Sequence, residues 1–439
     1  MITKEQKDTL HQMMEFAQKE GADDCRFSLS ICKESEFEYL NDELDKLQQS
    51  QETQLQIDLF VNHKFGSFST NRMEKKELQE LIEKGIKNVQ YLEEDSCHIL
   101  PSPEEYFKGE NTDLGQCDPS FEKISMEDKL RITQENVAEI EGKDHRIISI
   151  SGNYGDALEE SYMLTSNGFE GETSSSSFGL SVKVALQDKQ ESRPSECWYD
   201  SSISWNALQK KGIGEEALRR VCAKLNPQTI GSGKYKMLLD NRSWKKLLSP
   251  ILSAACGANL QQNNSFLLHA MDKKVFSEKL SITDNPHLFG AVGARWFDAE
   301  GVATQKYTFI EQGVLRTYYI DTYYAHKMNL PHTCTGISTL LFGLGEKDFP
   351  QLLSSMGKGV WVTDFNGGNS NPTTGDFSFG IEGFWVENGE IVMPISGMNI
   401  TGNLLTLFNN IVELGNDPYL SSSIQTPSIL FEEVDFSGE

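Results

Sequence analysis

The amino-acid sequence predicts an α+β protein. Its N-terminal half consists of two repeated units of helices and antiparallel sheet, and its C-terminal domain is β-rich with one amphipathic helix. In the first 228 residues, a helical apolar pattern followed by apolar residues at every second position occurs twice. After about residue 280, short alternating runs are separated by Gly, Asn and Thr. The predicted domains are residues 1–110, 111–228 and 229–439.

The first repeat begins with a helix. Thr3 and Gln6 fit a capping box, and an apolar face then continues to a stop at Gly21. Alternating apolar residues next predict strands, with a turn at residues 62–66, and a helix follows with apolar residues on one side. These later elements are expected at Phe27–Ile31, Leu55–Val61, the segment through Phe68, and Leu78–Val89.

The second repeat has the same order, beginning with a helix that Ser125 caps. Residues 54–64 (QLQIDLFVNHK) and 179–189 (GLSVKVALQDK) place apolar residues at matching alternate positions, 125 residues apart. A duplication explains this match, and a chance likeness between two amphipathic strands is the alternative. An acidic connector with several prolines, residues 93–122, separates the copies, and a helix at Glu215–Leu225 closes the second one.

The main domain boundary is expected between Asn226 and Gly233. A short strand at Tyr235–Leu239 precedes the amphipathic helix of the second half, for which Asp240 or Asn241 is a candidate cap. Two hairpins are then predicted, and the stronger signal is the Asn-Gly turn of the second. The hairpins are Tyr307–Ile310 with Val314–Ile320, and Phe384–Val386 with Ile391–Met393.

Charge and hydropathy exclude some classes of protein. The net charge is −25, from 40 Lys and Arg against 65 Asp and Glu, whereas a nucleic-acid binder needs a basic surface. No apolar run reaches the roughly 18–20 residues that cross a bilayer, and residues 1–6 lack the apolar core of a secretory signal. We therefore expect a cytoplasmic protein that contacts neither membrane nor nucleic acid directly. Its eight scattered cysteines should be reduced packing residues.

No catalytic set can be recognised from the residues alone. His326 and His332 flank Pro331, which prevents a shared helix face, and no H-E-x-x-H occurs. Residues 367–376 are rich in Gly and Asn and could bind an anion or a peptide through backbone N–H groups, but a tight structural turn is the favoured alternative. Five acids occur singly and are expected on the solvated surface: Asp58, Asp188, Asp298, Glu300 and Asp321.

Several segments of the second half resemble the TldD/PmbA family, whose members are also called modulators of DNA gyrase or TldD/TldE-type peptidases. The first half fits the family's layout of two smaller repeated segments. The segments that carry the resemblance are Phe276-Ser277, Ile282–Asp284, Phe297–Val302, Asn371–Ser378, Glu387–Glu390, Ser396-Gly397, Thr401–Asn403, Gly415–Asp417 and Thr426–Leu430.

The resemblance implies which branch of the family is present. In the TldD branch, an H-E-x-x-x-H helix and a late Cys hold zinc, which leaves one coordination position for an activated water. The matching positions here are Ser253, Ala254 and Ala258, and no cysteine follows Cys334. This degenerate zinc motif implies the PmbA (TldE) branch, with no catalytic residue, metal or cofactor of its own. Cys256, in an apolar stretch expected to be helical, is interpreted as an inert thiol.

The resemblance further implies a non-catalytic subunit of a peptidase that acts on unfolded peptides, paired with a TldD-like zinc subunit. A homodimer of the isolated chain is also expected, because the two branches share a fold. Two other hypotheses remain: a stand-alone peptidase with an unrecognised site, and a regulatory module that binds a protein such as DNA gyrase. The candidate peptide- or partner-binding residues are Asn371, Thr374, Gly375, Asp376, Gly402 and Asn403.

Overall fold

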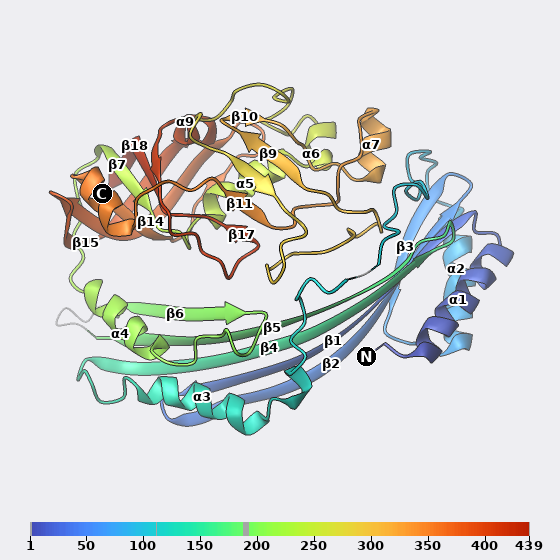
Figure 1. Cartoon of the computed structure of the whole chain (residues 1–439), viewed down its shortest axis with the longest axis horizontal. Coiled ribbons are helices and arrows are strands. Elements are labelled where there is room, and N and C mark those ends of the chain that lie inside the picture. The colour runs from blue at the N-terminus through green and yellow to red at the C-terminus, as the bar shows by residue number, and fades with distance from the viewer. Residues whose placement is uncertain (1, 111, 188–192, 439) are drawn as a thin grey trace.

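A long curved sheet forms the N-terminal half of the protein, and the C-terminal half lies over its concave side (Figure 1). The computed structural model describes residues 2–110, 112–187 and 193–438. In these residues the N-terminal sheet has the antiparallel strand order β3-β2-β1-β4-β5-β6. Its strands are β1 Asp24–Leu40, β2 Glu43–Val61, β3 Lys64–Thr70, β4 Ile147–Thr165, β5 Glu170–Leu186 and β6 Ser195–Ser202.

The central pairing of this sheet joins the two predicted repeats. Strand β1 pairs with β4 along almost its whole length, from Arg26 opposite Thr165 to Leu40 opposite Ser151. Each side of the pairing has its own helices and its own apolar core. The helices are α1 Lys4–Lys19 and α2 Lys75–Val89 on one side, and α3 Met126–Ala138 and α4 Ile213–Ala223 on the other. The order helix, three strands, helix is therefore present twice, as a duplication predicts.

The strands of the first repeat are longer than expected. The apolar alternation extends only over Phe27–Ile31 and Leu55–Val61, yet β1 and β2 continue as paired strands to a turn at Asn41. Residues 43–54 are mostly exposed and polar, so no alternation marks them. Their pairing with β1, which is itself paired with β4, explains why they are extended.

The C-terminal half contains two sheets around a shared core. In the described residues, one has the order β12-β7-β18-β15-β14-β13 with β16 beside β18, and the other has the order β10-β9-β8-β11-β17. The first comprises β7 Gly233–Leu239, β12 Gly359–Phe365, β13 Asn369–Ser370, β14 Asp376–Glu387, β15 Glu390–Asn403, β16 Ile411–Leu414 and β18 Ile429–Gly438. The second comprises β8 Ile282–Asp284, β9 Tyr307–Glu311, β10 Val314–Leu315, β11 Leu340–Phe342 and β17 Ile424–Gln425.

Short helices complete this half, and the predicted α+β class is confirmed. They are α5 Lys245–Ala254, α6 Gly257–Gln261, α7 Thr322–Met328, α8 Phe349–Met356 and α9 Leu404–Asn409. Trp244 lies at the centre of the core, against Phe342, Phe408 and Phe431. None of the helices in the described residues is long and apolar enough to span a bilayer.

Most predicted turns and caps are present, and two details differ. The Thr3 capping box and the Ser125 cap form as expected, and Asn388 and Gly389 have the positive φ angles of 53° and 77° that a tight hairpin requires. The predicted Asp240 or Asn241 cap is wrong. Helix α5 begins after Trp244, and the Asp240 carboxylate instead accepts a hydrogen bond from the Arg242 backbone N–H.

The second difference concerns the strand predicted at Val314–Ile320. Strand β10 ends at Leu315, although the Arg316 N–H still bonds to the Phe309 carbonyl. Beyond this bond the chain continues to α7. The Tyr318 hydroxyl bonds to the Leu267 carbonyl instead of facing another strand.

The connector between the repeats also attaches them to the C-terminal half. Asp95 accepts hydrogen bonds from Lys327 Nζ at 2.6 Å and from the Tyr323 hydroxyl at 2.9 Å, both in α7. His98 stacks between the rings of Phe65 and Tyr323. Residues of β3, the connector and α7 are thus held in one contact, which we call the Asp95 latch.

We predict that the Asp95 latch loses its stabilising effect in acid. The hydrogen bond from Lys327 holds the pKa of Asp95 well below its usual range. A carboxyl whose pKa is lower in the folded than in the unfolded chain stabilises the fold above the unfolded pKa, near 4, and ceases to do so as the pH falls further. Asp95→Asn should therefore lower the Tm by about 2 °C at pH 7, and less as the pH falls below 4.

Thermal unfolding of the wild type and the variant across pH 3–7 measures this difference. Asp42→Asn, at the exposed tip of the β1–β2 hairpin, is the matched control and should change the Tm little at any pH. A Tm difference for Asp95→Asn that stays constant down to pH 3 would contradict the assignment.

Candidate functional site

A large cleft separates the concave face of the N-terminal sheet from the C-terminal half. Its volume is about 1340 Å³, above the 300–1,000 Å³ of ordinary small-molecule pockets. Hydroxyl and amide side chains of β1, β2 and β5 line one side, including Ser28, Gln56 and the run Thr173–Ser177. The segment Val292–Ala299 lines the other side. The cleft can accommodate a segment of polypeptide and offers hydrogen-bonding groups to its backbone.

The three positions that the resemblance aligns with a zinc motif, Ser253, Ala254 and Ala258, do not share one helix. Helix α5 ends at Ala254, and α6 begins at Gly257 after Cys256, whose backbone is extended and forms a bridge with Tyr319. The expectation that Cys256 lies within a helix is therefore wrong. Gly257 also lies against Tyr324, where an added Cβ atom would be 2.7 Å from the Tyr324 Cβ and 3.0 Å from the ring.

The three motif positions differ in their neighbours and their burial. Ser253 Oγ accepts a hydrogen bond from Asn259 Nδ2 at 2.9 Å. Ala254, at the position of the catalytic acid in the motif, is fully buried in the apolar core. Ala258 is half-buried. Burial raises the pKa of the Cys256 thiol, whose Sγ donates to the Leu252 carbonyl, so this cysteine is a poor nucleophile.

The six candidate binding residues of the second half do come together. Asn403 Nδ2 donates to the Thr374 carbonyl at 2.8 Å and to Asp376 Oδ1 at 2.9 Å, and Thr374 Oγ1 donates to Asp376 Oδ2. The Gly375 N–H bonds to the Asn371 carbonyl. Gly402 lies beside them in β15, opposite Phe377.

Internal hydrogen bonds occupy the backbone N–H groups of this loop. The Thr373 and Thr374 N–H groups donate to Asn371 Oδ1, and the Asp376 N–H donates to Thr374 Oγ1. These groups do not form an anion nest, and the loop has the tight structural turn that its residues favoured. The loop contacts the segment that follows α6, because the Phe266 N–H donates to the Pro372 carbonyl at 3.1 Å.

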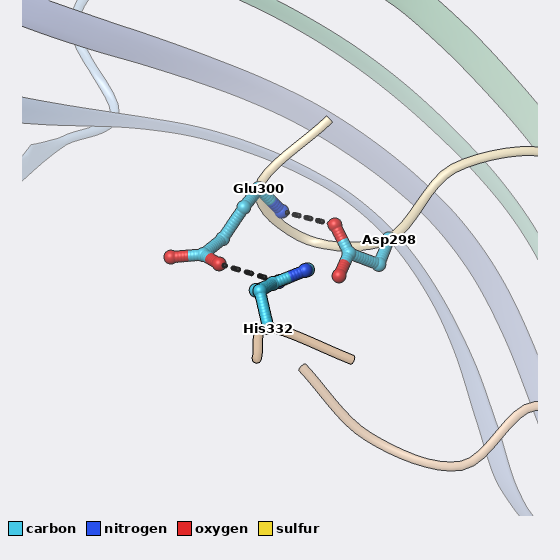
Figure 2. Close-up of side chains that lie close together, drawn as sticks. All are labelled: Asp298, Glu300 and His332. Carbon is cyan, nitrogen blue, oxygen red and sulfur yellow. Dashed lines mark hydrogen bonds and ion pairs between the residues drawn. The ribbon is translucent and has the colours of Figure 1, made fainter. Parts of the chain in front are cut away.

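A buried cluster of two carboxylates and an imidazole lies at the wall of the cleft. Asp298, Glu300 and His332 place one ligand-type atom each within 4.8 Å of the others, the one such group among the described residues (Figure 2). The acids come from the loop between β8 and β9, and the histidine follows α7. His332 Nε2 lies 3.6 Å from Glu300 Oε2, and these side chains are 10 % and 15 % exposed.

Backbone and hydroxyl donors fix the two carboxylates. Asp298 Oδ1 accepts from the N–H groups of Glu300 and Val302, and its Oδ2 accepts from that of Thr335. Glu300 Oε2 accepts from both the N–H and the hydroxyl of Thr322, at 3.0 and 2.7 Å. The cluster therefore has well-defined side-chain positions before any ligand arrives.

Burial and the charges of neighbouring groups shift the pKa values of Glu300 and His332 in opposite directions. Burial raises the pKa of Asp298, and the backbone hydrogen bonds to this carboxyl do not fully offset that effect. Burial alone would raise the pKa of Glu300 and lower that of His332. Their mutual attraction, with the Thr322 hydrogen bonds to Glu300, reverses both shifts. Each group therefore favours the charged form of the other, and their contact is an ion pair when His332 is protonated.

The sequence patterns did not reveal this cluster. Asp298 and Asp58 were expected on the solvated surface, but both are buried; Asp58 is paired with Arg26 at 2.7 Å. Asp321 caps α7 through the Tyr324 N–H, and Asp188 lies outside the described residues. The available signal was the D-x-E-G spacing, in which Gly301, with a φ of 86°, turns both acids inward. Nothing in the sequence pattern connects that turn with His332.

Sequence comparison places the chain in a known family. Residues 119–225 match the PmbA/TldA metallopeptidase central domain, and residues 232–438 match the PmbA/TldA metallopeptidase C-terminal domain. The chain belongs to the PmbA/TldD metallopeptidase family. This confirms the resemblance stated above.

Individual members of the PmbA/TldD family agree with this assignment. The metalloprotease PmbA homolog of Haemophilus influenzae is 28% identical over 412 residues, which are 90% of this chain and 88% of the other. The crystal structure of a candidate modulator of DNA gyrase from Bacteroides thetaiotaomicron is 46% identical, with a TM-score of 0.98 and full coverage of both chains. TldE from Thermococcus kodakarensis shares the fold, with a TM-score of 0.87, 19% identity, and coverage of 98% of this chain and 100% of the other.

We predict that the acid position of the motif no longer tolerates an acid. Ala254→Glu places a carboxylate in an apolar core without a partner, which should cost about 3–5 kcal/mol of unfolding free energy. Ala258→Glu, the same change at a half-buried position four residues later, should cost about 1 kcal/mol or less. Urea unfolding of both variants measures the difference. Equal stability of the two variants would show that the packing around Ala254 accepts the charge.

Proposed function

We propose that this protein is the non-catalytic, PmbA/TldE-type subunit of a two-component peptidase. A TldD-like subunit supplies the zinc and the catalytic acid, and this chain completes the chamber in which unfolded peptides are bound. The protein works in the cytoplasm, without a membrane or a nucleic acid as partner. The observation that carries the proposal is Ala254, a methyl group buried in the core where the family's peptidases have their acid.

The neighbouring positions support the same proposal. Ser253 and Ala258 offer neither an imidazole nor a carboxylate, and the break between α5 and α6 separates them. Zinc hydrolysis needs three protein ligands in fixed geometry and a group that manages the proton of the bound water. The described surroundings of these positions provide none of these.

The cleft supports a role in holding peptides. Side chains such as Ser28 and Gln56 can bond to the backbone of any sequence, and Arg26, the arginine on that wall, is already paired with Asp58. A chamber that accepts unfolded chains needs polar contacts of this sequence-independent kind. The family's names for its zinc-bearing and zinc-free branches motivate the pairing.

Reconstitution tests the proposal. The purified chain and a TldD-like subunit encoded by the same organism are mixed, and size-exclusion chromatography and cleavage of an unfolded peptide are measured. We expect a mixed complex with zinc-dependent cleavage, and no cleavage by this chain alone. Cleavage by the isolated chain would favour a stand-alone peptidase. Failure to bind the TldD-like subunit, with binding to purified gyrase instead, would favour the regulatory hypothesis.

We predict that the Asn371–Asp376 loop contacts the partner or the peptide. Thr373 is exposed at its tip, so Thr373→Arg adds bulk and charge without disturbing the internal hydrogen bonds of the loop, which use only the Thr373 backbone. The affinity for the TldD-like subunit or the peptide should fall at least tenfold, about 1.4 kcal/mol. Isothermal titration calorimetry measures both.

Thr229→Arg is the matched control, because Thr229 is also an exposed threonine of the C-terminal half but lies beside Ser396, away from the loop. It should leave both affinities unchanged. If Thr373→Arg binds both as the wild type does, the loop has no part in recognition.

A further inference from the structure

The cluster of Asp298, Glu300 and His332 has the composition of a metal site, and none of its members belongs to the motif at residues 253–258. It offers one imidazole nitrogen and two carboxylate oxygens within 4.8 Å of one another. Zinc binds such atoms at about 2.0–2.2 Å, so two ligands at tetrahedral angles lie about 3.3–3.6 Å apart. A separation of 4.8 Å would have to shorten by about 1.2–1.5 Å on binding. The 3.6 Å between His332 Nε2 and Glu300 Oε2 is close to a tetrahedral edge.

The second observation is an unsatisfied nitrogen. His332 Nε2 is buried and has no hydrogen-bond partner in the described part of the chain. Glu300 Oε2 is too distant for a hydrogen bond and is already engaged by Thr322. Figure 2 shows the ring of His332 facing both carboxylates. A buried polar atom without a hydrogen bond is destabilising, and a metal ion between these groups would give this nitrogen a partner.

The negative charges around the cluster also favour a bound cation. Asp321 and Glu105 add their negative charges to those of Asp298 and Glu300. Arg26 acts on Glu300 but is already paired with Asp58. Buried carboxylates in excess are stable when they coordinate a cation.

The supporting hydrogen bonds are those that metal ligands require. Backbone N–H groups of Val302 and Thr335 orient Asp298, and Thr322 orients Glu300. Such outer contacts hold carboxylate ligands ready for an ion. A mixed set of one nitrogen and two oxygens suits Zn²⁺ better than Mg²⁺ or Ca²⁺, which prefer oxygen ligands alone.

We propose that Asp298, Glu300 and His332 bind one divalent transition-metal ion, best matched by Zn²⁺. The site is structural. It joins the loop 298–302 to the segment after α7, and through the Phe107 N–H bond to the Gly301 carbonyl it also holds the connector. This inference does not rest on the proposed function, because it concerns the isolated chain without partner or peptide.

Metal titration of the full-length chain tests the proposal. The protein is stripped with a chelator and titrated with Zn²⁺ at pH 7.5 by calorimetry, in competition with a chelator of micromolar affinity, and the Tm is measured with and without Zn²⁺. We expect one tight site and a rise in Tm, since an ion that binds only the folded state stabilises it. The absence of a tight site in the wild type would overturn the proposal, and the cluster would then be an ion pair only.

Two histidine variants assign the site. His332→Gln should weaken Zn²⁺ binding at least 100-fold and abolish the rise in Tm. His287→Gln removes another half-buried histidine, which contacts Thr304 and lies outside the cluster, and should bind as the wild type does. Circular dichroism establishes that both variants fold. Equal loss in both, or tight binding retained by His332→Gln, would contradict the assignment.

If His332→Gln does not fold, Glu300→Gln gives the second test. It keeps an oxygen that can accept from Thr322 but removes the charge, so Zn²⁺ affinity should still fall at least tenfold. Unchanged affinity would exclude Glu300 as a ligand. Because no step uses a TldD-like subunit, failure here leaves the proposed function standing, and failure of the reconstitution leaves the metal site standing.

Discussion

The antiparallel pairing of β1 with β4 is the contact on which the rest of the structure depends. It joins two repeats with separate apolar cores into one continuous sheet. Strand twist accumulates along such a sheet and curves it, so the concave face exists only when both repeats are in register. The cleft, and the position of the C-terminal half over that face, follow from this one register (Figure 1).

Residues 253–258 of the C-terminal half have a packing role: Ala254 fills the core, and Gly257 allows α7 to approach through Tyr324. Polar chemistry is concentrated instead in two loops, Asp298–Val302 and Asn371–Asp376. Both are fixed by hydrogen bonds from backbone N–H groups to side-chain oxygens.

Local signals in the sequence predicted local structure well. Thr3 with Gln6, Ser125, and Asn388 with Gly389 each define a cap or turn within a few residues, and each forms as expected. The long polar part of β1 could not be predicted, because it pairs with β4, more than 100 residues away in the chain, and the polar part of β2 is extended through its pairing with β1. The acidic cluster was missed for the same reason: Asp298 and His332 meet only through the path of the chain around α7.

The central pairing also determines how this chain can be made. Strand β1 ends at Leu40, but its partner strand β4 extends to Thr165, so about 125 further residues must be synthesised before the pair is complete. At about 5–20 residues per second this takes roughly 6–25 s. During that time the edge of β1 that later pairs with β4 has unpaired backbone N–H and C=O groups, and other chains can pair with it. Folding of this protein is therefore governed by non-local contacts, which are slow to form, and its nascent chain is the form most exposed to misassembly.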